Sequence, residues 1–180
     1  MHPDGFETEE DLPLVHFVHG KGSGPWGTKI CRLAQIARDR GCEVESLDYS
    51  EMDALPRAEK LVLACRDVSQ PLVFVGSSMG GWVAAAASRE VPVSGLFLLA
   101  PAFYFPGYPD VVPGCPGAHI EVVHGWNDDV ILYEHSLRFS KKYGATLHLV
   151  EDDHRLFESL ELTGEYFSDF LGRLALRTAG

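Results

Sequence analysis

The sequence has few basic residues for its length. Its 180 residues include 15 lysines and arginines against 26 aspartates and glutamates, which gives a formal net charge of −11. A negative average field repels phosphates, nucleic acids and anionic membrane surfaces, and no run of basic residues counters it. We therefore expect neither a nucleic acid nor a membrane among the partners of this protein.

Long apolar runs and paired cysteine motifs are also missing. No stretch is long enough to span a bilayer, and the acidic N-terminus lacks the apolar core of a signal peptide. The four cysteines show no C-x-x-C spacing and lie mostly within apolar segments, as reduced core thiols do. These absences favour a cytoplasmic protein. From the length and composition of the chain, we expect residues 1–11 to form a flexible tail and residues 12–180 to form a single domain.

Short apolar stretches alternate with amphipathic ones along the rest of the chain. The expected strands are residues 14–18, 42–47, 72–76, 95–100, 119–123 and 146–150. The expected helices are residues 28–40, 54–65, 80–89, 132–143 and 158–176. This alternation predicts an α/β fold, a three-layer αβα sandwich around a mostly parallel six-stranded sheet. The active sites of such sheets lie beyond the carboxyl ends of the strands.

The segment "GSSMG" has the pattern G-x-S-x-G between the third expected strand and an alanine-rich helix. A serine in this kind of strained turn needs small residues two positions away on each side, here Gly76 and Gly80. Ser78 would then stand above the sheet edge as a nucleophile, with the Met79 amide beside it as an oxyanion donor. The plainer alternative is a glycine-rich turn in which the serine only caps the helix.

A serine nucleophile requires a base and an orienting acid, in the chain order Ser, Asp or Glu, His. Asp128 and Asp129 follow the fifth expected strand in "HGWNDDVI", and His154 follows the sixth in "EDDHRLF". Each of these residues alone is typical of a solvated loop. Their order, and their positions after successive parallel strands, favour a catalytic triad.

These motifs resemble those of the α/β-hydrolase superfamily, and the chain is similar to its compact, lidless serine esterases over about residues 14–176. The family pattern H-G-x-x-D-x-x-V is matched by His124, Gly125, Asp128 and Ile131. The resemblance implies that Asp128 is the triad acid and that no metal or organic cofactor is needed.

The loop "FVHGKGSGPWGTK" allows two interpretations. Three glycines spell G-x-G-x-x-G from Gly22 to Gly27, and Asp48 lies about 20 residues beyond, as in dinucleotide-binding folds. However, three residues separate this motif from the preceding strand, and Pro25 has no N–H to offer a phosphate. The resemblance instead implies that the loop supplies the second oxyanion donor, the amide of Lys21 with Gly22 as the nearby substitute.

The segment between the fourth and fifth strands, residues 101–118, is too short for a helical lid domain. Aromatic residues in this segment and beside the candidate loops could wall a pocket for a small acyl group: Trp26, Trp82, Phe103 and Trp126. We therefore predict hydrolysis of small neutral carboxylic esters through an acyl-enzyme, with thioesters or amides as possible variants of the substrate. The alternatives are a hydrolase-fold module that only binds or regulates, and a dinucleotide-binding domain.

Overall fold

The structure is a computed structural model that describes residues 12–111, 113 and 117–178; the predicted tail at residues 1–11 lies outside the described residues. Its centre is a six-stranded sheet in the order β2-β1-β3-β4-β5-β6. All neighbouring strands pair in parallel, as predicted. The strands are β1 (Leu14–Val18), β2 (Glu43–Ser46), β3 (Leu72–Ser77), β4 (Gly95–Leu99), β5 (His119–Gly125) and β6 (Thr146–Val150).

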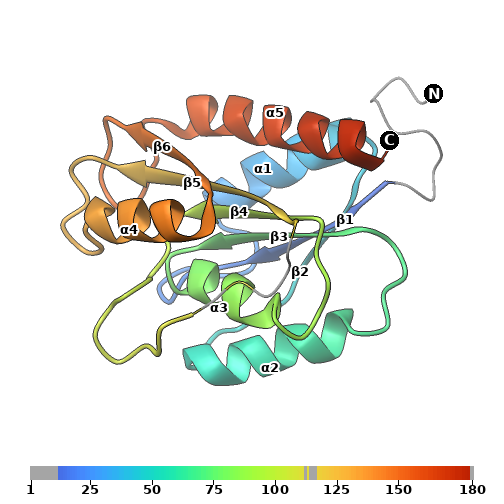
Figure 1. Cartoon of the computed structure of the whole chain (residues 1–180), viewed down its shortest axis with the longest axis horizontal. Coiled ribbons are helices and arrows are strands. Elements are labelled where there is room, and N and C mark those ends of the chain that lie inside the picture. Colours follow the sequence, from blue (N-terminus) through green and yellow to red (C-terminus); the bar gives the residue numbers. More distant parts are fainter. Residues whose placement is uncertain (1–11, 112, 114–116, 179–180) are drawn as a thin grey trace.

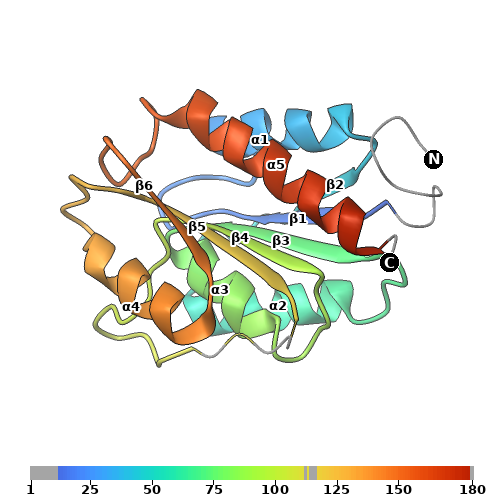
Figure 2. The ribbon, with the colours of Figure 1, turned by 45° about the horizontal axis from the view of Figure 1, so that its top comes forward.

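Helices cover both faces of this sheet (Figure 1). They are α1 (Thr28–Asp39), α2 (Ala54–Cys65), α3 (Met79–Ala87), α4 (Tyr133–Tyr143) and α5 (Leu160–Thr178). The turned view in Figure 2 shows α1 and α5 on one face and α2, α3 and α4 on the other. Because both faces are covered, the central strands β1, β3 and β4 are buried along their whole length and are mostly apolar. Within the described residues, no helix combines the length and the apolar character needed to cross a bilayer.

Two element boundaries differ from the prediction in ways that concern the site. Helix α3 begins at Met79, one residue earlier than expected, because the backbone turns sharply at Ser78 and becomes helical at once. Helix α5 begins at Leu160, two residues later than expected. The delay arises because the Ser159 amide and hydroxyl bind the Asp152 carboxylate, which keeps this segment in a loop.

The strand order places a topological switch point between β1 and β3. The chain leaves β1 for β2 on one side and returns to β3 on the other, so the loops after β1 and β3 diverge to opposite faces. Ligand sites of open α/β sheets lie in the crevice at such a point. The observed order is not the 3-2-1-4-5-6 arrangement of the dinucleotide-binding fold.

Candidate active site

Ser78 lies in the turn between β3 and α3, with φ 55° and ψ −118°. A positive φ of this kind is uncommon for a residue with a side chain and persists only when the surroundings hold it. Here the Ser78 amide donates to the Leu99 carbonyl at 2.9 Å, and the Ala102 amide donates to the Ser78 carbonyl at 3.0 Å. The end of β4 and the segment after it therefore fix the turn.

The glycines of the G-x-S-x-G motif are required by close backbone packing. A Cβ atom on Gly76 would collide with the backbone of Gly80, and a Cβ atom on Gly80 would collide with the carbonyl of Val18. Only glycine at both positions lets α3 approach the ends of β1 and β3 this closely. The turn is therefore a nucleophile elbow in its geometry, as the sequence pattern predicts.

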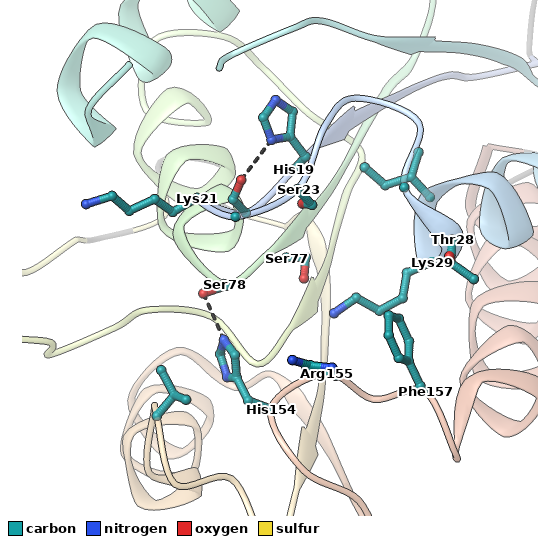
Figure 3. Close-up of a pocket in the computed structure, with 15 residues that line it drawn as sticks. His19, Lys21, Ser23, Thr28, Lys29, Ser77, Ser78, His154, Arg155 and Phe157 are labelled. Atoms are coloured by element: carbon teal, nitrogen blue, oxygen red, sulfur yellow. Dashed lines mark hydrogen bonds between the residues drawn. The ribbon is translucent and has the colours of Figure 1, made fainter. Parts of the chain in front are cut away.

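Of the three predicted triad residues, His154 lies in hydrogen-bonding distance of both Ser78 and Asp128. His154 Nε2 is 3.0 Å from Ser78 Oγ, and His154 Nδ1 is 2.7 Å from Asp128 Oδ2. Since an ionised carboxylate only accepts hydrogen bonds, Nδ1 carries the imidazole proton and Nε2 is free to accept one from the serine. Figure 3 shows His154 reaching from its loop toward Ser78.

The carboxylate of Asp128 is saturated with donors. Its Oδ1 accepts hydrogen bonds from the amides of Val130 at 2.9 Å and Ile131 at 2.8 Å. Its Oδ2 lies 2.9 Å from His124 Nε2, in addition to the bond from His154. Burial raises the pKa of Asp128, but the hydrogen bonds from the two histidines and Ile131 outweigh it and hold the pKa well below its usual value. Asp128 is thus ionised at neutral pH.

His124, which the sequence marks only through its place in the H-G-x-x-D pattern, also contacts the Asp128 carboxylate. It is fully buried, and its Nδ1 accepts a hydrogen bond from the Ser136 hydroxyl at 2.7 Å. Its Nε2 faces two acceptors, the Asp128 carboxylate and the Ile131 carbonyl 2.8 Å away, so Nε2 carries the proton and Nδ1 is left to accept. The histidine that begins the H-G-x-x-D pattern is the sequence signal that could have identified this contact. The neighbouring Asp129, by contrast, is exposed.

The base of the loop after β1 is held by two buried side chains. His19 Nε2 accepts from the Tyr49 amide at 2.9 Å, so its Nδ1 carries the proton that it donates to the Gly20 carbonyl at 2.8 Å. Burial lowers the pKa of His19, which keeps the imidazole neutral. Arg57, on α2 and also buried, donates to the His19 carbonyl at 2.8 Å. No local sequence pattern distinguished Arg57 from an ordinary helix-surface arginine.

The two predicted oxyanion donors lie next to Ser78. Met79 is the first residue of α3, and Lys21 lines a cavity together with Ser78 and Gly22. Among the described residues, neither the Met79 amide nor the Lys21 amide has an acceptor. Both N–H groups are therefore available to a ligand oxygen, and their catalytic role stays a prediction.

One cavity is lined by Ser78 and a second by its neighbour Met79. The first, of about 520 Å³, is bordered by Ser78, His154, the loop after β1 and the start of α1. The second, of about 440 Å³, lies between Met79 and Tyr108 and includes the predicted Trp82. Lys21 borders both cavities. Within the described part of the chain, no group of three His, Cys, Asp or Glu side chains could hold a metal ion.

The other predicted aromatic residues lie outside both cavities. Phe103 is a core residue that stacks on Phe139 with ring centroids 4.0 Å apart. Trp26 lies beside the Arg38 guanidinium, and Trp126 packs edge-on against Tyr133. Phe103 is thus part of the core, whereas Trp26 and Trp126 are exposed on the surface, and none of the three walls a cavity at the serine.

Comparison with known proteins agrees with this architecture. A sequence model of the alpha/beta hydrolase family matches residues 17–178. No curated protein matches the chain. Among solved structures, a hydrolase of the α/β superfamily from Xanthomonas campestris is similar with a TM-score of 0.81 and 27% identity, over 89% of this chain and 97% of that one.

Two more distant structures share the fold. Est1E from Butyrivibrio proteoclasticus has a TM-score of 0.75 at 19% identity, over 92% of this chain and 89% of its own. An α/β serine hydrolase without a lid, also from Xanthomonas campestris, has a TM-score of 0.73 at 16% identity, over 89% of this chain and 81% of its own. With a family match that covers nearly the whole sheet and both helical layers, this chain belongs to the alpha/beta hydrolase family.

Proposed function

We propose that the chain is a serine hydrolase that cleaves small carboxylic esters through a covalent acyl-enzyme. Ser78 is the nucleophile, His154 the general base and Asp128 the acid that orients the imidazole. The observation that carries the proposal is the chain of hydrogen bonds from Asp128 through His154 to a serine held at positive φ. A structural serine at a helix start needs neither the strain nor the histidine.

The geometry supports the following sequence of steps. Ser78 Oγ attacks the ester carbon while its proton moves to His154 Nε2, and the carbonyl electron pair moves onto oxygen. The amides of Met79 and Lys21 stabilise that oxyanion. The intermediate then collapses, and the imidazolium gives its proton to the departing alcohol. Water, deprotonated by the same histidine, releases the acid and restores the serine.

The substrate is a small molecule, since the two cavities are of the size that small ligands occupy. Thioesters and amides would follow the same acyl-transfer chemistry. The negative charge of the whole chain favours neutral esters, whereas the lysine and arginine side chains that line the cavity beside Ser78 are positively charged. We also propose a cytoplasmic location, which the free thiols of Cys31 and Cys65 support.

A fluorophosphonate probe tests the proposal directly, because it labels only serines that are activated for attack on phosphorus. We expect one label on Ser78, located by peptide mass mapping, and none on Ser78→Ala. Hydrolysis of 4-nitrophenyl acetate and butyrate should disappear in the same variant. A folded protein that takes no label and cleaves no ester would instead be a binding module built on the hydrolase fold.

A further inference from the structure

The cavity beside Ser78 has a charge opposite to that of the chain. Three basic residues, Lys21, Lys29 and Arg155, line it, and no aspartate or glutamate is found among the described residues on its walls. The chain as a whole carries a net charge of −11. Chance placement of the charged residues would favour acidic walls, so the composition of this cavity points to an anionic ligand.

Lys29 is the central member of this group. It is the second residue of α1 and is half-buried. Figure 3 shows its amino group directed into the cavity, toward Ser77 and Arg155, while the side chain of Lys21 extends away from them. The ammonium group of Lys29 makes no hydrogen bond or ion pair with any residue in the described part of the chain. A half-buried ammonium group without an acceptor is costly, and a ligand anion would relieve that cost.

The carboxylates nearest Lys29 are already bound elsewhere. Asp128 accepts its hydrogen bonds from the triad histidine and its own loop, and Asp152 accepts from the Ser159 amide and hydroxyl at 2.8 and 2.7 Å. Burial lowers the pKa of Lys29 to about 8, while the charges of Asp152, Asp128 and Asp153 act in the opposite direction. Lys29 is therefore mostly protonated at neutral pH and available to a ligand.

Two further features of the cavity favour an anion. Arg155, from the loop after β6, brings a guanidinium group to the same wall, and its fork of donors matches a carboxylate. The first turn of α1 also borders the cavity, and the amides of a first helical turn have no partner within the helix. The positive end of the helix dipole adds to the attraction.

We infer that the substrate carries a free carboxylate in addition to its scissile ester, and that Lys29 and Arg155 bind this carboxylate in the cavity beside Ser78. This inference deepens the proposed function and rests on it. A monoanionic carboxylate fits better than a phosphate dianion, because the repulsion from a chain of net charge −11 grows with the charge of the ligand.

Matched substrates test the inference by kinetics. In one pair, 4-nitrophenyl hydrogen succinate and 4-nitrophenyl butyrate, the carboxylate is in the acyl part; in the other, 3-acetoxybenzoate and its methyl ester, it is in the leaving group. In at least one pair, we expect the anionic ester to have a lower KM than its neutral partner. Lys29→Met should raise the KM of that anionic ester about tenfold and change the KM of the neutral ester less than about twofold. Lys29→Arg should retain most of the preference.

Lys141→Met, an exposed change on α4, is the matched control and should leave the preference unchanged. The Lys29→Met protein should melt at the same temperature or higher, since it loses an unpaired buried charge. High salt should weaken the preference of the original enzyme. Equal KM values for both members of both pairs, in an enzyme that cleaves the neutral esters, would overturn the carboxylate site and leave the proposed hydrolase intact.

Binding to a protein that cannot react separates this inference from the chemistry. We expect calorimetry to show monomethyl succinate binding to Ser78→Ala, and about tenfold weaker binding when Lys29→Met is added. Inorganic phosphate should compete poorly at neutral pH. Tighter binding of phosphate than of the carboxylate, or carboxylate binding that is independent of Lys29, would overturn the inference even if the esterase activity is confirmed.

Discussion

At the scale of single residues, Ser78 occupies a backbone conformation that its own side chain disfavours, with φ 55°. Glycine adopts such a conformation at little cost. We therefore expect Ser78→Gly to abolish hydrolysis yet raise the free energy of unfolding by about 1 kcal/mol. The relief of backbone strain stabilises the folded state, and the greater flexibility of glycine in the unfolded chain offsets part of this gain. Ser78→Ala should abolish hydrolysis without this gain. Equal stability of the two variants would argue against strain at the elbow.

The two adjacent acids after β5 differ sharply in environment, since Asp128 is buried and bonded to His154 while Asp129 is exposed. Asp128→Asn should lower kcat/KM by about four orders of magnitude, because an amide does not hold the imidazole in the tautomer that accepts the serine proton. Asp129→Asn is the matched control and should stay within a few-fold of the original enzyme. The reverse ranking would contradict the observed triad.

The charge of Lys29 predicts a pH effect on specificity. Its pKa, lowered by burial to about 8, means that the ammonium is present below this pH and lost above it. The ratio of KM for 4-nitrophenyl hydrogen succinate to KM for the butyrate ester should therefore rise above about pH 8. The ratio removes any titration of the triad, which affects both esters. Lys29→Arg, which stays charged, should keep the ratio flat; a rise in that variant would mean that another group is responsible.

At the scale of secondary-structure elements, the loops that carry the acid and the base are tied together. The Trp126 amide donates to the Val150 carbonyl at 2.9 Å, and the Asn127 amide donates to the Asp152 carbonyl at 3.0 Å. These bonds extend the pairing of β5 and β6 beyond the strands. The distance between Asp128 and His154 is therefore set by the sheet, which favours a preorganised site.

Gly125, at the end of β5, tests this coupling. A Cβ atom there would collide with the Asp152 carbonyl and lie 2.7 Å from the carbonyl of Asp153. Gly125→Ala should thus push the two loops apart, lower the free energy of unfolding by about 2 kcal/mol and reduce kcat much more than it raises KM. Gly24→Ala, where nothing lies within 4 Å, is the control and should be close to neutral. Full activity in Gly125→Ala would show that the loops adjust freely.

At the scale of the whole molecule, a buried carboxylate joins the sheet to α5. Glu121 on β5 lies 2.7 Å from His119 Nε2 and His148 Nε2, and it accepts a hydrogen bond from Arg173 of α5 at 2.7 Å. Burial raises the pKa of Glu121, but its histidine and arginine partners outweigh this and hold it below the ordinary value of 4.5. The stabilisation is therefore present above pH 4.5 and is lost as the pH falls through the lower folded-state pKa.

Glu121→Gln should remove this contribution. We expect a free energy of unfolding lower by about 1.5 kcal/mol at neutral pH, because the change weakens the charged hydrogen bonds of a buried carboxylate whose Arg173 partner is half exposed. The variant should also lose less stability than the original protein between about pH 5 and pH 3. Urea unfolding at several pH values measures both effects, with the exposed Glu165→Gln of α5 as control. Parallel stability curves for Glu121→Gln and the original protein would rule out this linkage.

Much of the fold and the triad could be predicted from the sequence because the relevant signals are local. The alternation of apolar and amphipathic stretches predicts parallel strands, and parallel strands bring their carboxyl ends to one edge. Ser78 directly follows β3, and Asp128 and His154 lie in the loops just after β5 and β6, so the topology brings all three to that edge. The glycines at 76 and 80 mark the elbow because close backbone approach allows no other residue there.

The remaining features depend on contacts between distant segments, which no local pattern records. Arg57 reaches the loop after β1 from helix α2. Phe103 packs into the core, whereas Trp82, which is also aromatic, borders a cavity. The clearest case is charge: the composition determines a net charge of −11, but only folding brings Lys29 and Arg155 to the same wall beside the serine. A sequence average contains the number of charges and not their positions, and electrostatic interactions depend on distance and burial.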